Sequence, residues 1–337
     1  HLNSAIHYLL HASGPQQVSY FDSNFSRLER TVRLSGYPHS AQQTLFAAVC
    51  RRAEQENTPI EIVHHRLDNS MQGVILPERS AGAFGFDVYD PEEPNVLAVL
   101  APEQLAPILE NLEKARSIFG KARLLHDEQE KIYLSQMDFS AADRLTEKMI
   151  DLLLGGKQSG RPGREIHRFF GAATADGNLD YVPEVTASIP KRYFIKGRPG
   201  TGKSTFLKKL ARAALNRGYT VERYHCSLDP KSLDLVAVRE LGFCLLDSTA
   251  PHEYFPSRSG DEILDMYQLC VTPGTDEAYA AQLQNLQTAY KELVQTAVSC
   301  LKEAKGAADR FDAALPQPDP AAMEQVKANL LAQLFSP

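Results

Sequence analysis

The chain has 337 residues, of which 43% are apolar and 23% charged, and its net charge is −6. This length allows two domains with separate cores, and the composition is ordinary for a globular protein. The negative net charge offers no general attraction for nucleic acid or anionic membranes, and no apolar run approaches the ~20 residues of a membrane span. Five cysteines without a C-x-x-C spacing argue against a disulfide framework and a zinc site, so we expect a reducing, cytoplasmic location.

The first half of the chain ends in sequence with helical periodicity. Apolar residues recur at helical spacing over 105–119, in a helix that we expect to reach about residue 134, and a second helix is expected at 139–154. The next stretch, GGKQSGRPG (155–163), is glycine-rich and lacks apolar side chains, which is typical of an exposed linker. The sequence therefore predicts a first domain at 1–154, a linker at 155–163 and a second domain at 164–337.

The second half contains a short apolar strand, KRYFIK (191–196), a glycine-rich turn and then an amphipathic helix. The turn fits the pattern G-x-x-x-x-G-K-[ST] at every defined position. Its glycines let backbone N–H groups turn inward around a phosphate, Lys203 can reach the outer phosphates, and Ser204 can bind Mg²⁺. The residues predicted to contact the phosphates are Gly197, Pro199, Gly200, Thr201, Gly202, Lys203, Ser204 and Thr205.

This strand, loop and helix resemble the P-loop NTPase superfamily. The resemblance implies an α/β fold that binds ATP or another nucleoside triphosphate with Mg²⁺. The runs YHCSLDPKSLDLV (224–236) and LLDSTAPHEYFPSR (245–258) resemble, more narrowly, a bacterial family of duplicated P-loop proteins described as ATPase or nucleotide-kinase-like. We therefore predict an α/β fold with two tandem P-loop NTPase-like domains, each a parallel sheet with flanking helices followed by a helical segment. The guanine-reading motif N-K-x-D is absent, which favours ATP over GTP.

The two halves of the chain repeat one another. Positions 36–68 match positions 197–229 without a gap. Self-similarity of this kind indicates a duplicated domain. Pairs aligned outside this block include His7 with His167, Gly85 with Gly242, and Asp90 with Asp247.

The first copy lacks the residues that would bind a phosphate. Its loop has His39, Ala41, Gln42 and Gln43 where the second loop has Gly200, Gly202, Lys203 and Ser204. A charged hydrogen bond is worth roughly 1.5–3 kcal/mol, so losing the lysine alone weakens binding by about one to two orders of magnitude. We expect a degenerate nucleotide domain kept for architecture, with binding of another anion as the alternative.

The second copy continues with a predicted strand, TVERYHC (220–226), and an apolar run, LGFCLLD (241–247), that ends in an acid. A central parallel strand would deliver Asp247 to the same sheet edge as the loop. We expect Asp247 to hold Mg²⁺ opposite Ser204, and the alternative is an acid that merely closes the strand.

Further candidates follow these strands. Glu253 or His252 could orient an attacking water, and Arg258 could stabilise charge on the transferring phosphoryl group. At the end of the preceding strand, an acid near Mg²⁺ or an acceptor is expected from the resemblance to nucleotide kinases, and a His/Cys metal site there lacks a second pair of ligands. The residues considered at that strand end are His225, Cys226 and Asp229.

The second half also ends in helical sequence. Residues 279–300 carry apolar side chains at heptad spacing, and a further helix is expected at 319–335. Two interpretations stay open, a helical hairpin packed on its own domain and a projecting arm or lid.

The sequence is compatible with three alternative functions. The first is hydrolysis of a nucleoside triphosphate, ATP in preference, coupled to a conformational change. The second is transfer of the phosphoryl group to a small molecule or nucleotide under a helical lid. The third is a nucleotide-dependent binding switch with little turnover, acting on an unidentified protein or small-molecule partner.

The repeat suggests how the degenerate copy could contribute. We expect an intramolecular pseudo-dimer in which the first copy completes the active site, with Arg66 and Arg79 as candidate groups. In that arrangement, residues 164–337 alone would bind ATP but turn it over more slowly than the whole chain.

Overall fold

The computed structural model describes residues 5–90, 92 and 96–337. Contacts between residues divide it into two compact units, which cut across the predicted domain boundaries. Unit 1 consists of His1–Ser117, Phe169–Ala187 and Ala297–Pro337. Unit 2 consists of Ile118–Arg168 and Ser188–Thr296. Each unit is therefore built from parts of both sequence repeats.

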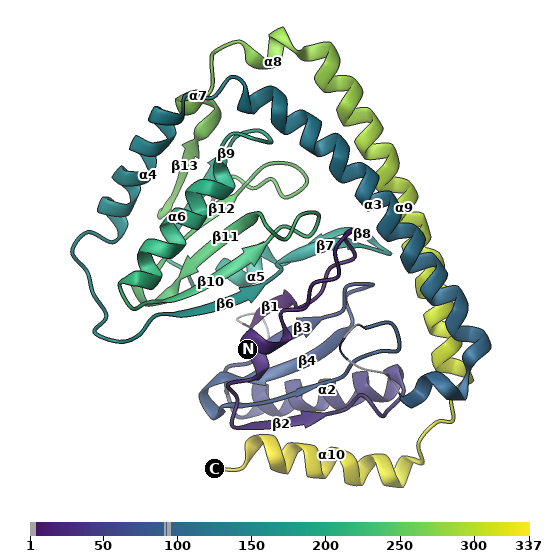
Figure 1. Cartoon of the computed structure of the whole chain (residues 1–337). Coiled ribbons are helices and arrows are strands. Elements are labelled where there is room, and N and C mark those ends of the chain that lie inside the picture. The colour runs from purple at the N-terminus through teal and green to yellow at the C-terminus, as the bar shows by residue number, and fades with distance from the viewer. Residues whose placement is uncertain (1–4, 91, 93–95) are drawn as a thin grey trace. The chain divides into compact units, whose positions relative to one another are not determined.

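Within the described residues, unit 1 contains a five-stranded sheet in the order β1-β3-β4-β5-β2. Strand β4 is antiparallel to both neighbours, and the other pairs are parallel. The helices α2 and α10 pack against each other and share one apolar core with this sheet (Figure 1). The strands, in sheet order, are β1 (Ile6–Leu9), β3 (Glu61–His64), β4 (Met71–Leu76), β5 (Ala81–Phe84) and β2 (Arg30–Arg33). The helices are α1 (Phe21–Phe25), α2 (His39–Gln55), α5 (Val182–Thr186) and α10 (Pro320–Phe335).

Unit 2 contains a six-stranded sheet in the order β13-β9-β12-β11-β10-β6. Helix α6 packs on β11, β10 and β12, and α4 packs on α6, so sheet and helices enclose a second core (Figure 1). The strands, in sheet order, are β13 (Asp261–Asp265), β9 (Lys191–Lys196), β12 (Phe243–Asp247), β11 (Leu233–Val238), β10 (Thr220–His225) and β6 (Arg164–Arg168). The helices are α4 (Phe139–Leu153), α6 (Lys203–Asn216), α7 (Met266–Cys270) and α8 (Thr275–Ala278).

The strand order of the first sheet recurs in the second, where β6, β10, β11, β12 and β9 take the places of β1, β3, β4, β5 and β2. The shared register also corrects one alignment made from the sequence. A 3₁₀ turn at Pro77–Arg79 precedes β5 as the turn at Arg239–Leu241 precedes β12, so β5 corresponds to the start of β12. The position that matches Asp247 is therefore Gly85 and not Asp90.

The sheets are mixed, whereas the sequence predicted parallel ones. Strand β11 runs antiparallel to β10 and β12, as β4 does to its neighbours. The reason is the short connection from β11 to β12, a 3₁₀ turn and Gly242 with φ +71°. A parallel crossover needs a dozen or more residues, so a connection this short permits only an antiparallel pair.

Two helical segments pack away from the repeat that precedes them in the chain. Helix α4 follows the first repeat, but its Met149 and Leu153, with Leu154 directly after the helix, are buried in the core of unit 2. Helix α10 follows the second repeat but buries Leu330 and Leu334 in the core of unit 1. The predicted helices at 139–154 and 319–335 are confirmed, and the prediction that each domain is continuous in sequence is wrong.

The hairpin formed by β7 (Gly171–Thr174) and β8 (Gly177–Asp180) also belongs to unit 1. Leu9 and Phe169 exchange backbone hydrogen bonds of 2.8 and 2.9 Å, and both side chains are fully buried. The Tyr181 ring stacks on His64, with 4.3 Å between the ring centroids. This segment of the second repeat is therefore part of the core of unit 1.

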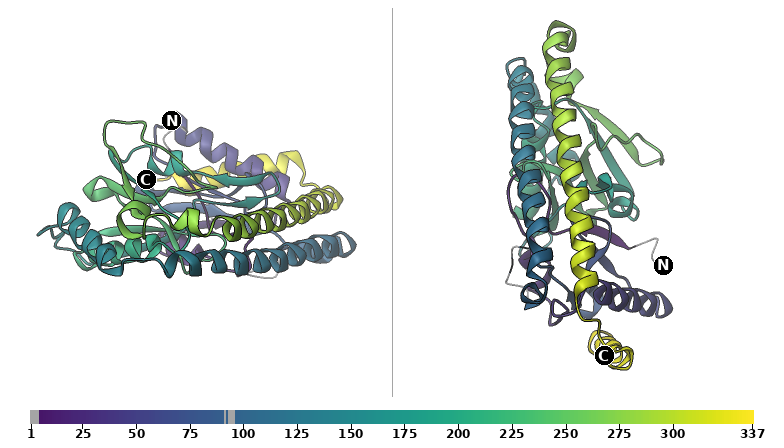
Figure 2. Two further views of the ribbon diagram at one scale, coloured as in Figure 1. Left: turned by 90° about the horizontal axis from the view of Figure 1, so that it is seen from above. Right: turned by 90° about the vertical axis from the view of Figure 1, so that its right-hand side faces the viewer.

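Two long helices complete the described residues. Helix α3 (Pro102–Leu134) begins in unit 1 and ends in unit 2, and α9 (Ala280–Ala314) does the reverse. Figure 2 shows each as an uninterrupted helix, which confirms the helical periodicity read from both segments. Neither these nor any other helix of the described residues combines the length and apolar character needed to cross a bilayer.

Each repeat contains a pair of neighbouring, partly buried histidines. In unit 1, His7 Nδ1 lies 2.8 Å from His64 Nε2, and in unit 2, His167 Nδ1 lies 2.8 Å from His225 Nε2. The second ring nitrogen of His225 lies 2.6 Å from the carbonyl oxygen of Pro230. Burial, reinforced by the neighbouring His167, lowers the pKa of His225 from 6.5 to about 4, against the opposing effect of the Pro230 carbonyl. His225 therefore has a structural role.

We expect this histidine to make unit 2 less stable in mild acid. Between pH 6.5 and about 4 the unfolded chain binds a proton that folded His225 excludes, so the free energy of unfolding falls as the pH is lowered through that window. Urea unfolding followed at several pH values should show this fall in the native chain, and a smaller fall in His225→Gln. The same pH dependence in both proteins would contradict the assignment.

Candidate functional site

The loop Gly197–Gly202 connects β9 to α6 in unit 2. Gly200 and Gly202 have φ of +80° and +84°, a left-handed conformation that side chains rarely adopt. Thr201 is fully buried, and its Oγ1 donates to the Arg198 carbonyl at 2.8 Å and accepts from the Arg198 N–H at 3.2 Å. The loop conformation thus depends on its glycines and on one buried threonine.

Lys203 and Asp247 meet beside this loop. Lys203 Nζ lies 3.7 Å from Asp247 Oδ2 and donates to the Arg198 carbonyl at 2.7 Å. Strands β9 and β12 are parallel neighbours, so the loop after one and the acid at the end of the other lie at the same sheet edge. Ser204, next in the chain, accepts a hydrogen bond of 3.0 Å from the Leu233 N–H. Its hydroxyl therefore faces the start of β11 on the same edge.

A segment of α3 lies over the loop within unit 2. A Cβ on Gly200 would overlap the carbonyl oxygen of Glu130, so only glycine permits this approach. Arg123 lies 3.5 Å from Asp229, which follows β10, and His126 lies 3.3 Å from Glu130 along the helix. The first sequence repeat thus contributes a helical cover to the loop of the second, which favours the lid interpretation for this part of α3.

Asp234 is a site residue that the sequence reasoning missed. Burial and the neighbouring Asp247 raise its pKa from 3.8 to about 7, while His252 and Lys203 act in the opposite direction. Asp234 is the second residue of β11, and it reaches the loop edge because that strand runs antiparallel to its neighbours. Asp234 belongs to no recognised sequence motif. Its position near the loop depends on the antiparallel direction of β11, which the sequence did not reveal.

Of the proposed catalytic residues, Glu253 lies near the loop edge of the sheet, whereas Arg258 lies at the opposite edge. Glu253 has a half-exposed side chain, and its Oε1 lies 3.9 Å from Lys196 Nζ, at the end of β9 that leads into the loop. Arg258 instead donates to the Ile189 carbonyl at 2.8 Å and lies 3.9 Å from Asp261. Those partners stand where β9 and β13 begin, at the sheet edge opposite the loop, so the assignment of Arg258 to the phosphoryl group is wrong.

The matching loop of the first copy is not a phosphate cradle. Helix α2 begins at His39, which corresponds to Gly200, whereas α6 begins three positions later at Lys203. Residues 39–41, which correspond to the end of the second loop, therefore belong to the first turn of α2. Gln42 replaces Lys203 and is fully buried, with its Nε2 donating to the Tyr37 carbonyl at 2.9 Å.

The acid of the second copy is also replaced in the first. Gly85 matches Asp247, and a Cβ there would overlap the amide of Gln42. The lysine and aspartate of one copy are thus represented by a packed glutamine and glycine in the other. Arg66 and Arg79, proposed to complete the active site, donate to the carbonyls of Tyr89 and Phe335 in unit 1 at 2.5 and 2.9 Å. Instead, the part of the first repeat that contacts the loop is α3, at Glu130.

The described site can hold an anion in a glycine loop beside one lysine and two carboxylates. The loop glycines and the start of α6 offer backbone N–H groups, and Ser204 and Asp247 offer oxygen ligands of the kind that Mg²⁺ prefers. Comparisons with protein-family models, with curated proteins and with solved structures found no match for this chain.

Proposed function

We propose that unit 2 binds a nucleoside triphosphate with Mg²⁺ at residues 197–205 and hydrolyses it, with ATP as the expected nucleotide. The observation that carries the proposal is the distance of 3.7 Å between Lys203 Nζ and Asp247 Oδ2. It brings the lysine of a glycine loop next to an acid from a neighbouring strand, at the edge where ligands bind in open α/β sheets.

Each residue then has a physical role. The loop N–H groups and Lys203 hold the phosphates and stabilise the negative charge that develops on them. Ser204 and Asp247 would hold Mg²⁺, which would neutralise negative charge on the phosphates. Asp234 accepts a proton from the attacking water, because a carboxyl with a pKa of about 7 is matched to neutral pH.

The cover formed by α3 provides the coupling to a conformational change. The Glu130 carbonyl oxygen lies directly over Gly200. A triphosphate in the loop would repel this oxygen, because both carry negative charge. Nucleotide binding is therefore expected to shift α3 near Glu130, and release of phosphate to let it return.

The decisive experiment replaces Asp247 with Asn, which keeps the shape of the side chain and removes its charge. We expect nucleotide binding to persist in part, while its Mg²⁺ dependence and any phosphate release disappear. Binding is measured by calorimetry with and without Mg²⁺, and release by a phosphate assay. Undiminished hydrolysis would mean that Asp247 only closes its strand.

Phosphoryl transfer is the second candidate, and Asp234 is the observation that favours it. A partly buried carboxyl with a raised pKa suits deprotonation of an acceptor hydroxyl as well as of water. ADP formation that requires an added acceptor would select this function, and phosphate release without one would select hydrolysis. Tight nucleotide binding with negligible turnover would instead indicate a switch.

A further inference from the structure

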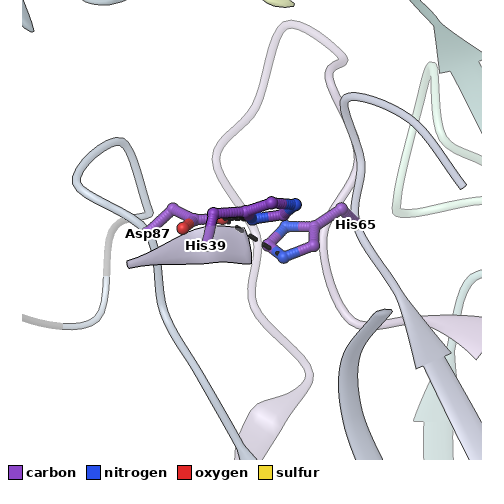
Figure 3. A group of neighbouring side chains, drawn as sticks. All are labelled: His39, His65 and Asp87. Carbon is purple, nitrogen blue, oxygen red and sulfur yellow. Dashed lines mark hydrogen bonds and ion pairs between the residues drawn. The ribbon is translucent and has the colours of Figure 1, made fainter. Parts of the chain in front are cut away.

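Three side chains that could hold a metal ion converge in unit 1, at the place where the second repeat has its glycine loop. His39 is the first residue of α2, His65 directly follows β3, and Asp87 follows β5. Figure 3 shows both imidazole rings beside the carboxylate of Asp87. The three residues lie at three separate elements far apart in the chain, so no motif with a fixed spacing could predict the cluster. The number and spacing of the cysteines, which argued against a zinc site, do not bear on these three residues.

The distances between the three side chains suit a shared ion. His39 Nδ1 lies 3.3 Å from Asp87 Oδ2, and His65 Nε2 lies 3.2 Å from the same oxygen. In a tetrahedral site with metal–ligand bonds of about 2.0–2.1 Å, the ligand atoms lie about 3.3–3.4 Å apart. All three ligand atoms lie within 4.8 Å of one another.

A second observation is that the His65 side chain is buried and its ring nitrogens lack hydrogen bonds. Its side chain is 1% exposed, and neither ring nitrogen makes a hydrogen bond, although Nε2 faces Asp87. Buried polar groups are normally paired, and an unpaired buried nitrogen is unfavourable. A metal ion bound to Nε2 would satisfy the nitrogen that faces Asp87.

A cavity of about 230 Å³ adjoins the cluster within unit 1. His39 and Asp87 line it, together with Tyr89, whose hydroxyl donates to Asp87 Oδ2 at 3.2 Å. A hydrogen bond of this kind orients a carboxylate ligand. His65 is not among the lining residues, so an ion held by the three side chains would have its free coordination position on the cavity side.

We propose that unit 1 binds one divalent transition-metal ion of the zinc class through His39 Nδ1, His65 Nε2 and Asp87 Oδ2. Two imidazoles and one carboxylate suit such ions, whereas Mg²⁺ and Ca²⁺ prefer oxygen ligands. Three protein ligands leave a fourth position for water or a small anionic ligand in the cavity, as in zinc sites that are open to substrate. The first repeat would then carry a metal site at the place where the second carries its glycine loop.

The test titrates the metal-free full-length chain with Zn²⁺ and Co²⁺. We expect one Zn²⁺ per chain, and Co²⁺ absorption bands of the intensity typical of tetrahedral coordination. His65→Gln and Asp87→Asn should each weaken Zn²⁺ binding by about 100-fold or more, because a ligand is lost. His39→Gln should do the same, and its partly exposed position makes loss of folding an improbable cause.

Two control variants distinguish the site from other histidines. His64→Gln alters the neighbouring buried histidine and should keep full affinity. His126→Gln disrupts the other described cluster, His126, Asp127 and Glu130, and should also keep it. Zn²⁺ should raise the unfolding temperature of the native chain but not of Asp87→Asn. Absence of saturable Zn²⁺ binding, equal affinity in His39→Gln, or loss only in His126→Gln would overturn the proposal.

Discussion

Replacing Lys203 with Ala should weaken ATP binding by about 10- to 100-fold or more, whereas replacing Gln42 with Ala should change it by no more than about twofold. A lysine that bonds to phosphate contributes roughly 1.5–3 kcal/mol, and its loss also leaves Asp247 facing the phosphates without a balancing cation. Gln42 is the matched control, because it occupies the same position of the repeat and already bonds within its own unit. Calorimetric titration with ATP and Mg²⁺ measures both variants.

The structure indicates why these two variants should remain folded. Lys203 opens α6 and Gln42 lies in the first turn of α2, where Ala is a good helix former. Thermal unfolding of each variant checks this directly. Equal losses of ATP affinity in the two variants would contradict the assignment of nucleotide binding to the second loop alone.

The fragment 164–337 should fail to form a stable nucleotide-binding unit, in contrast to the expectation from the sequence that it binds ATP and turns it over slowly. It lacks α4 and the residue after it, so it loses Met149, Leu153 and Leu154, which are 3%, 8% and 0% exposed in the core of unit 2. Removing a single buried side chain of this size costs about 2–5 kcal/mol, and a whole domain is stable by only about 5–15 kcal/mol.

The fragment 118–337 is the matched control, since it restores α4 and the part of α3 that lies over the loop. We expect 118–337 to retain cooperative unfolding and ATP binding, and 164–337 to lose both. Circular dichroism during heating and calorimetry with ATP measure the two properties. Cooperative unfolding and undiminished ATP affinity in 164–337 would show that α4 is dispensable.

Local patterns were sufficient for much of this protein. The apolar run before a glycine turn predicted β9 and the loop, and apolar periodicity predicted α4, α9 and α10. The repeat predicted a duplicated domain, and the two sheets indeed share a strand order. These features depend on residues close together in the chain, because helix and strand periodicity and glycine conformation act over a few positions.

Other features depended on contacts between distant residues. The direction of β11 placed Asp234 at the loop edge, and the packing of α3 placed Glu130 over Gly200. Arg258 was misassigned because the sequence does not reveal at which end of the sheet a loop residue finds its partners.

By itself, the sequence determined the loop, the long helices, three strands of the second half and the duplication, because each depends on neighbouring residues or on a repeated order. Only the tertiary structure decided that α4 and α10 pack away from their own repeats and that His39, His65 and Asp87 converge. Apolar periodicity predicts that one face of a helix is buried, but it does not predict against which core that face packs. The reason is that any apolar surface of suitable shape can cover the same face.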